Sequence, residues 1–308
     1  AFSKANIKQL AAALGLTARR ILLSCLTLHQ NDPEMHPPVV FHTVDFGGKS
    51  YHIIDFAVEA QAVSFHHPMH WLFAEMLKHV NIMTKANVQS LGKSSLAELL
   101  STDIDENGFL VLLEFPLRVT VKLAQARSGM WVRNGLALRS QAHHYRENPM
   151  RDIMYDQDLY LLQCGLLLAS SDRWLVSMVD RFGLTDLFER GGSIADQILL
   201  MADEFMLLLI FPVTEPALLG GWSTEKQIRR EIVQFLAFGP STYSDLTKHI
   251  SERLAEHSSF EKVLAEVSKF RAPEGVHDLG MFELRDKAYE EVRPYFMHYT
   301  RNQREKAE

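Results

Sequence analysis

The chain has 308 residues, of which 47% are apolar and 23% are charged, and its formal net charge is −6. This length corresponds to about two domains, and the acidic balance argues against nucleic acid as a partner. The two cysteines, Cys25 and Cys164, exclude a disulfide framework and any cysteine-rich zinc module. So few cysteines also fit a reducing compartment, and we expect a cytoplasmic location that can extend to the nucleus.

The first 57 residues predict a helical segment followed by a β-hairpin. Residues 3–29 carry a partial apolar helical face, and Ser3 is a suitable N-cap. Two β-prone runs, 39–46 and 49–56, are separated by Gly47-Gly48. Two glycines between two such runs predict a hairpin with a two-residue turn.

Helical periodicity dominates residues 58–221, which we expect to form one helical scaffold domain. Pro68 suits the first turn of a helix, whose apolar face would contain Met69, Leu72, Met76 and Val80. Further helices are expected at 94–101, 109–126, 158–168, 174–182 and 194–211, and Pro116 would kink or break the second of these.

The most apolar stretch of the chain covers residues 205–213. Asp203 and Glu204 interrupt the apolar run just before it, and Pro212 would end it. A membrane span needs about 20 apolar residues. We therefore expect a buried helix at this position and no membrane partner.

Residues 222–308 have the element order of a winged helix. Helices are expected at 225–238, 242–250 and 258–270, followed by a β-prone run at 281–284 and a last helix that opens at Asp286. The third helix carries balanced charges, whereas binding to DNA phosphates needs a net positive charge. The sequence thus predicts a mainly α fold, in which an irregular helical scaffold domain with a small β-hairpin precedes a winged-helix-like domain, with the boundary near Gly221.

One acidic motif leaves an alternative function open. Asp103, Asp105, Asn107 and Glu114 have the spacing of the ligands in a calcium loop. Val111 occupies a position that usually supplies an oxygen or a water. The simpler interpretation is an acidic turn between two helices, and a calcium-binding helical module is the alternative.

Several histidines resemble a metal cluster at first sight. His66, His67 and His70 are close in sequence, with Glu75 and His79 nearby. Adjacent histidines diverge around a helix start, and bulky apolar residues crowd the same turn. We therefore interpret them as capping and packing residues, and we expect no metal, no cofactor and no catalytic residue in this chain.

The strings Gly129-Met-Trp-Val-Arg-Asn-Gly135 and Phe65-His-His-Pro-Met-His-Trp71 are distinctive, and three further strings accompany them. Together they resemble the UBR-box ubiquitin-protein ligases, the recognins of the N-degron pathway. The most specific is the first string, and the likeness runs from about residue 58 to the end. The three further strings are Glu114-Phe-Pro-Leu-Arg118, Met154-Tyr-Asp-Gln-Asp158 and Tyr295-Phe-Met-His-Tyr299. Within these strings we expect a structural role for His67, Trp71, Arg118, Met130, Trp131, Arg133, Asn134, Gly135, Tyr155, Asp156, Asp158, His298 and Tyr299.

The chemistry of the matched residues suits such a role. Trp131 offers a large surface to bury and one N–H that needs a partner. Arg118 and Arg133 can pair with carboxylates or with helix ends. Asn134-Gly135 tolerates a left-handed backbone and suits a helix end or a tight turn.

The resemblance implies a RING-type ligase that transfers ubiquitin from a conjugating enzyme to proteins with destabilising N-termini. Such ligases use zinc in the UBR box and in the RING-type domain, and two cysteines can build neither module. We therefore expect an internal scaffold segment that positions substrate-recognition and ubiquitin-transfer modules outside this chain. Its partners would be other domains of the same ligase and, indirectly, the conjugating enzyme and N-degron substrates.

Overall fold

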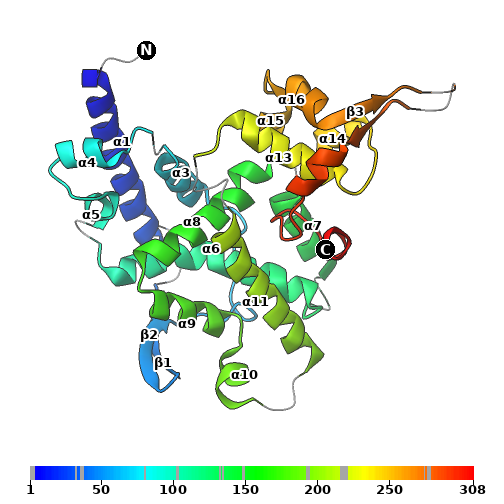
Figure 1. Cartoon of the computed structure of the whole chain (residues 1–308). Helices are drawn as coiled ribbons and strands as arrows, with labels where there is room; N and C mark the ends of the chain where they lie inside the picture. Colours follow the sequence, from blue (N-terminus) through cyan, green and yellow to red (C-terminus); the bar gives the residue numbers. More distant parts are fainter. Residues whose placement is uncertain are drawn as a thin grey trace. The chain divides into compact units, whose positions relative to one another are not determined.

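The computed structural model describes residues 4–31, 33–34, 38–79, 81–101, 104–131, 133, 135–147, 150–191, 195–215, 221–273, 275 and 279–308. The chain divides into two compact units, residues 1–139 with 157–212 and residues 140–156 with 213–308. Both units are mainly helical, as the sequence predicted (Figure 1). Residues 140–156, which no local pattern separates from the helical domain, belong to the second unit.

The first unit begins with helix α1 (Lys4–Leu26), the short α2 (Leu28–Asn31) and a hairpin of β1 (Phe41–Phe46) and β2 (Lys49–Ile54). The strands are antiparallel, and Phe46 pairs with Lys49. Gly47 and Gly48 between them have φ of 58° and 73°. Because only glycine adopts such angles readily, the two glycines set the turn that the sequence predicted. The proposed N-cap Ser3 lies outside the described residues.

The next helices along the chain are α3 (Pro68–Leu77), α4 (Lys85–Ser90), α5 (Leu96–Ser101), α6 (Glu106–Arg127), α7 (Gly135–Arg146), α8 (Tyr155–Leu168), α9 (Ser171–Arg181), α10 (Thr185–Arg190) and α11 (Asp196–Thr214). In the first unit, α1 packs on α3, α4, α5 and α6, and α9 packs on β2 and α6. The hairpin therefore rests on the helical body through its second strand.

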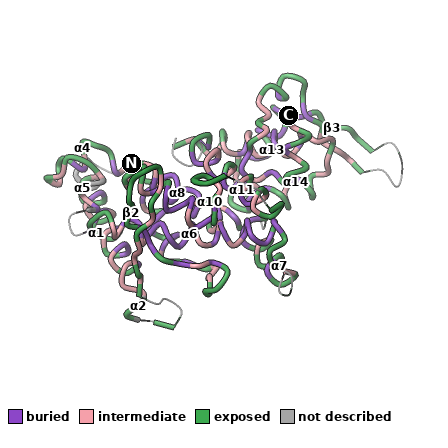
Figure 2. Tube along the Cα trace, turned by 90° about the horizontal axis from the view of Figure 1, so that it is seen from below, coloured by how far each residue is buried: buried purple, intermediate pink, exposed green. Residues whose placement is uncertain are grey.

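Helix α6 is the central element of the first unit, because it is buried on all sides over its middle turns (Figure 2). Pro116 lies inside it, and the helix continues unbroken to Arg127. Of the two expected effects of this proline, a kink or a break, the break does not occur. The residues on either side of it, Phe115 and Leu117, are buried, and their packing offsets the backbone hydrogen bond that proline cannot make.

Helix α3 starts at Pro68 as predicted, but it buries a different face. His70, Trp71, Phe73 and Leu77 are buried, whereas Leu72 of the expected face is 46% exposed. The last residue of that expected face, Val80, is outside the described part of the chain. Nearly every turn of this helix is apolar, so periodicity cannot choose the buried face, and the neighbouring helices decide it.

Helix α11 continues through Pro212 and ends at Thr214, three residues after the end of the helix predicted at 194–211. It is therefore longer than the apolar stretch, and α1 and α11 are the two described helices that are long and apolar enough to cross a membrane. Length and composition do not separate such helices from core helices. In the middle of α11, Glu204 accepts a hydrogen bond from Arg127 at the end of α6.

The second unit contains the 3-10 helix η1 (Arg151–Ile153), then α13 (Thr224–Leu236), α14 (Tyr243–His249), α15 (Glu252–Ala255), α16 (Phe260–Val267), β3 (Ser268–Arg271), β4 (Met281–Leu284), the 3-10 helix η2 (Asp286–Glu291) and α17 (Arg301–Ala307). One apolar cluster takes residues from α13, α14, α15, α16, β4 and η2. This arrangement confirms the expected winged-helix order.

Two details of the winged-helix unit differ from the prediction. The third helix ends at Val267, and the next four residues form β3, which pairs antiparallel with β4. Phe270 lies opposite Phe282 in this pair, with ring centroids 5.1 Å apart. The expected last helix is instead the 3-10 helix η2, followed later by α17. The partner strand therefore decided the conformation of residues 268–271, which local periodicity had assigned to a helix.

The packing around Gly165 of α8 gives a first testable prediction. A Cβ atom at this glycine would lie 2.8 Å from Leu113 Cδ1 and 3.0 Å from Trp174 Nε1, and both neighbours are buried. We expect Gly165→Ala to destabilise the chain by about 1–2 kcal/mol, since overpacking outweighs the better helix propensity of alanine. Urea unfolding followed by tryptophan fluorescence measures this change.

The matched control is Gly135→Ala at the start of α7, where an added Cβ meets no atom within 4 Å. This variant should keep the stability of the parent chain. Equal stability of the two variants would show that the packing around Gly165 has room for a methyl group.

Candidate functional site

A buried ionic network joins α6 to α9 and to the hairpin. Glu114 is 1% exposed, and its Oε1 lies 2.7 Å from Nε of Arg181 and accepts a hydrogen bond of 3.0 Å from Nε of Arg118. Arg181 also donates to the backbone carbonyls of Ile54 and Phe56 at the end of the hairpin. The carboxylate of Glu114 thus contacts two arginines, and one of them, Arg181, also bonds to the end of the hairpin.

The same network includes a stacked aromatic ring. The guanidinium of Arg118 lies 3.5 Å from the ring centroid of Phe56. Burial lowers the pKa of Arg118, and the charge of Glu114 opposes this shift. Breaking a buried pair of this kind is costly, because the remaining charge has no water to solvate it.

A second buried contact in the first unit joins α3 to α8. Trp71 donates a hydrogen bond of 3.0 Å from Nε1 to Asp158 Oδ1, and Asp158 is 1% exposed. One residue earlier on α8, Gln157 donates to Glu75 of α3 over 2.8 Å. The indole and the carboxylate each satisfy the other, as a buried tryptophan N–H requires.

The histidines before and within α3 pack against aromatic rings. His67 is the N-cap residue of α3, and its ring centroid lies 5.8 Å from that of Phe115. His70 lies closer to the same phenylalanine, at 4.6 Å. Within the described part of the chain, no group of three or more His, Cys, Asp and Glu residues is arranged to hold a metal ion.

The Gly129–Gly135 string begins at the end of α6. Trp131 donates from Nε1 to Gln125 Oε1 over 3.1 Å, and Lys122 Nζ lies 3.2 Å from the centroid of its ring. Met130 is 38% exposed. Trp131 therefore has the partner that its N–H needs, and this partner comes from the helix that precedes it.

The rest of that string makes fewer contacts. Arg133 is exposed, and no carboxylate among the described residues pairs with it. Gly135 is the first residue of α7, which agrees with a helix end at this position. Asn134 lies outside the described residues.

A second buried network lies in the winged-helix unit. Arg151 of η1 donates to Glu231 of α13 over 2.5 Å and to the carbonyl of His249 over 2.6 Å. His298 Nε2 lies 3.4 Å from Asp156 Oδ1 and 3.9 Å from Glu231 Oε1. Several of these residues line a pocket of about 380 Å³. In this unit the paired charges thus lie beside a cavity.

Burial controls the protonation of His298. Its side chain is 7% exposed, and burial lowers its pKa well below the ordinary value of 6.5. The positive charges of Arg151 and Arg230 act in the same direction, while Glu231 opposes them. The imidazole is therefore neutral at neutral pH, and its contacts with the two carboxylates are polar contacts between a neutral ring and an anion.

Gln234 of α13 is a connecting residue that sequence reasoning missed. It is 1% exposed, and its Nε2 donates to the carbonyl of Glu291 over 2.8 Å. Its Oε1 accepts hydrogen bonds from the backbone N–H of Arg293 and from the hydroxyl of Tyr299, both over 2.9 Å. A glutamine inside an amphipathic helix gives no local signal of such a connecting role.

Tyr155, also in a family string, has its ring centroid 6.0 Å from that of His298.

The described part of the acidic motif does not form a calcium loop. Asp105 caps α6 by accepting a hydrogen bond of 2.9 Å from the backbone N–H of Gly108, and α6 is helical from Glu106 onward. Asn107 accepts a hydrogen bond from Arg173, while Glu114 belongs to the buried ionic network. Asp105 and Glu114 are therefore separated by more than two helical turns, or about 13 Å along the axis. Asp103 lies outside the described residues.

The two cysteines are buried, free thiols. Burial raises the pKa of Cys25 to about 12 and that of Cys164 to about 11. A thiol with such a pKa is almost entirely protonated at neutral pH and is a weak nucleophile. Neither cysteine is suited to covalent catalysis.

Comparison with known families covers both units. Residues 25–193 match the model of the UBR1/2/3-like ARM repeat domain, and residues 227–308 match the winged-helix domain of UBR1-like E3 ubiquitin-protein ligases. The chain belongs to the UBR1-like family of E3 ubiquitin-protein ligases. The matched ranges contain Glu114 and Arg181 of the first network and Gln234 and His298 of the second.

Individual relatives agree with this assignment. The chain is 38% identical over 272 residues to the E3 ubiquitin-protein ligase ubr1 of Schizosaccharomyces pombe, a match that covers 86% of the chain and 13% of the relative. It is 32% identical over 268 residues to human UBR1, covering 85% and 15%, and 29% identical over 252 residues to PRT6 of Arabidopsis thaliana, covering 79% and 12%. This UBR1-like chain thus spans less than a sixth of the length of these relatives.

The buried ionic network of the UBR1-like chain gives a second prediction. We expect Glu114→Gln to destabilise the first unit by about 3–5 kcal/mol, because Arg118 and Arg181 would lose the buried carboxylate that both contact, and Arg181 would keep only the longer pair with Asp180 at 3.9 Å. The control is Asp186→Asn, which removes a pair with Arg190 whose side chains are 83% and 80% exposed.

Urea unfolding of the two variants separates the outcomes. The control should shift the free energy of unfolding by no more than about 0.5 kcal/mol. A similarly small shift for Glu114→Gln would show that the buried pair contributes no more than a surface pair.

The neutral His298 gives a third prediction, for the pH dependence of stability. The unfolded chain binds a proton at this histidine below pH 6.5, whereas the folded chain does not. Stability should therefore fall as the pH drops from about 7 to 5, by up to about 1.4 kcal/mol per pH unit from this group. The variant His298→Gln should have a shallower slope in calorimetric unfolding, and identical slopes for the two proteins would contradict the assignment.

Proposed function

We propose that this chain is a structural segment of a RING-type E3 ubiquitin-protein ligase of the N-degron pathway, and that it holds substrate-recognition and ubiquitin-transfer modules in position. The observation that carries the proposal is that polar residues of the family strings bond to partners inside the chain. Asp158 bonds Trp71, Glu114 bonds two arginines, and Tyr299 bonds Gln234, each within its own unit. Groups committed to internal partners stabilise a fold and are not poised for a reaction.

The proposed role also implies which modules would hold the zinc of such a ligase and where in the cell the protein would be found. Two cysteines supply too few ligands for a UBR box or a RING-type domain, so the zinc would be held by modules outside these 308 residues. We propose a cytoplasmic location, extending to the nucleus. The conjugating enzyme and the N-degron substrates would meet those other modules, and this segment would act on them indirectly.

Helix α11 supplies a surface for contacts with other domains of the ligase. Its inner face, with Met201, Phe205 and Leu208, is buried. On the opposite side, Leu199 is 47% exposed and Met206 is 51% exposed. These two residues are seven positions apart, or nearly two helical turns, so they lie on the same side of the helix.

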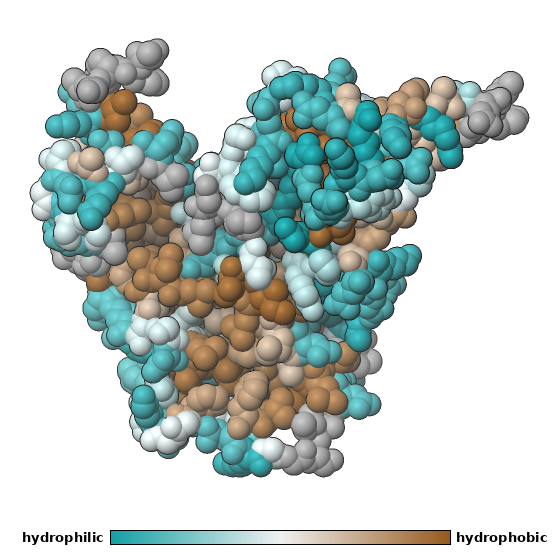
Figure 3. Space-filling model, in the orientation of Figure 1, coloured by the Kyte–Doolittle hydropathy of each residue, from teal (hydrophilic) through white to brown (hydrophobic). Residues whose placement is uncertain are grey.

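An apolar surface of this kind is unusual for a protein that makes no contacts there. Figure 3 shows apolar side chains gathered over the part of the first unit that includes α11. Exposed apolar area on the outer side of a helix whose inner side is already buried costs solubility and typically marks a contact surface. We define Leu199 and Met206 as the outer face of α11 and propose that another domain of the same ligase covers it.

A chimeric ligase tests the proposed function. The chain would replace the matching segment of the S. pombe relative, and transfer of ubiquitin to a substrate with a destabilising N-terminus would be measured. We expect transfer by the chimera and none by the 308-residue chain alone. The double variant Leu199→Glu/Met206→Glu should lower transfer by about tenfold or more, because charged residues at a packed contact cost more than 1.4 kcal/mol.

The matched control is Leu136→Glu/Leu167→Glu, which replaces two leucines that are 85% and 75% exposed elsewhere in the first unit. It should transfer ubiquitin at the rate of the parent chimera. Ubiquitin transfer by the isolated chain would contradict the structural role. Equal rates for the two double variants would contradict the assignment of the contact to α11.

A further inference from the structure

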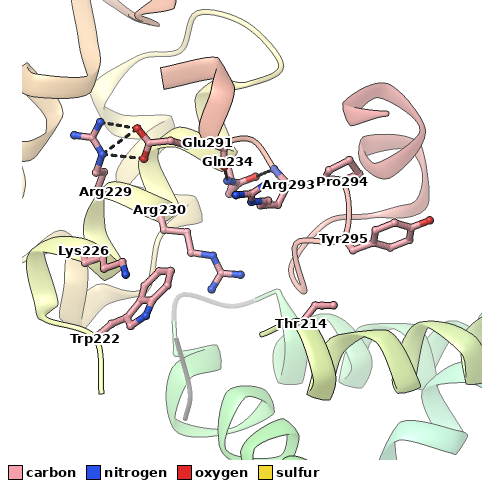
Figure 4. Close-up of a pocket in the computed structure, with 10 residues that line it drawn as sticks. All are labelled: Thr214, Trp222, Lys226, Arg229, Arg230, Gln234, Glu291, Arg293, Pro294 and Tyr295. Atoms are coloured by element: carbon pink, nitrogen blue, oxygen red, sulfur yellow. Dashed lines mark hydrogen bonds and ion pairs between the residues drawn. The ribbon is translucent and has the colours of Figure 1, made fainter. Parts of the chain in front are cut away.

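The winged-helix unit contains a second pocket, of about 570 Å³, at the beginning of α13. One wall is formed by Trp222, Lys226 and Arg230, and the other by Arg293 and Tyr295, which follow η2. Figure 4 shows the side chain of Arg230 reaching into the space between the two walls. The volume is in the range of sites that hold a small ligand or a few residues of a peptide.

Positive charge exceeds negative charge in this pocket. Arg229 makes a two-pronged pair with Glu291, at 2.6 and 2.9 Å, and Arg230 makes one with Glu215. Lys226 and Arg293 also line the pocket, and neither pairs with a carboxylate among the residues that the structure describes. Two cations are therefore available to an anionic ligand.

The walls also provide apolar and aromatic surface. The Nζ atom of Lys226 lies 3.7 Å from the ring centroid of Trp222, and Tyr295 is 43% exposed. The ring of Pro294 lies beside Tyr295 in the lining. A ligand that fits both features would carry negative charges next to an apolar or aromatic group.

The net charge of the whole unit favours a peptide over a nucleic acid as the ligand of this pocket. Residues 140–156 and 213–308 contain 16 Lys and Arg residues against 19 Asp and Glu residues. A polyanion that covered this surface would meet net negative charge outside the pocket. A short acidic segment would place its charges only where the cations are.

We propose that this pocket binds an acidic peptide segment in which carboxylates flank an aromatic side chain. Lys226 and Arg293 pair with the carboxylates, and the aromatic side chain packs against the wall that contains Trp222. This inference goes beyond the structural role proposed above and does not depend on it. A failure here would leave the role of the first unit and of α11 unchanged.

Fluorescence anisotropy with the whole 308-residue chain tests the pocket. The probe is a fluorescein-labelled peptide with the sequence Asp-Glu-Phe-Asp-Glu, titrated at low salt. We expect saturable binding that weakens with salt, and a loss of about tenfold or more in affinity for Lys226→Glu/Arg293→Glu. The conservative variant Lys226→Arg/Arg293→Lys should restore most of the affinity.

The control Lys269→Glu/Lys287→Glu changes the net charge of the same unit equally, at exposed residues outside the pocket. It should leave the affinity within about twofold of the parent chain, a difference of less than 0.5 kcal/mol. Circular dichroism checks that each variant folds. If the charge-reversal variant Lys226→Glu/Arg293→Glu unfolds, Lys226→Gln/Arg293→Gln takes its place. The proposal would be overturned if the pocket variant and the control variant lost peptide affinity equally. It would also be overturned if a single-stranded oligonucleotide bound more tightly than the peptide.

Discussion

The contact between Glu114 and Arg181 is the interaction on which the first unit depends. It places a carboxylate of the central helix α6 against a guanidinium of α9 that also holds the end of the hairpin. Both side chains are almost completely buried, so each loses most of its compensation when the other is removed: Glu114 would keep Arg118, and Arg181 would keep only the longer pair with Asp180 at 3.9 Å. The pair therefore fixes the position of α9 and the hairpin on α6, a selection that apolar packing does not make by itself.

This constraint fits the structural role proposed for the residues of the family strings. The carboxylate of Glu114 is shared by two arginines, and Asp158 is committed to the N–H of Trp71, so both acidic groups have partners inside the first unit. The winged-helix unit follows the same rule, because Gln234 bonds to Glu291 at the end of η2 and to Arg293 and Tyr299 after it, and His298 is kept neutral by burial. Among the described residues, the surfaces that we propose for partners are the outer face of α11 and the pocket at the start of α13.

The sequence predicted elements that local chemistry decides. Gly47-Gly48 set a hairpin turn, Pro68 opened a helix, and the order of helices and strands after residue 222 indicated a winged helix. It did not predict what depends on distant neighbours. The buried face of α3 and the strand conformation of residues 268–271 are set by partners elsewhere in the chain. The partner of Glu114 could not be read from spacing, since Arg181 lies on another helix. The motif around Glu114 therefore suggested a loop ligand, whereas the residue is part of the core.

A double-mutant cycle between Glu114 and Arg181 tests the central claim most directly. Of the four tryptophans, Trp71, Trp131 and Trp174 lie in the first unit, so a Trp222→Phe background makes tryptophan fluorescence report on that unit alone. Urea unfolding would be measured for this background and for its Glu114→Gln, Arg181→Met and double variants. The account predicts a coupling energy of about 2 kcal/mol or more, because the second substitution removes the charge that the first leaves unpaired. A coupling energy below about 0.5 kcal/mol, the range of an exposed pair, would contradict it.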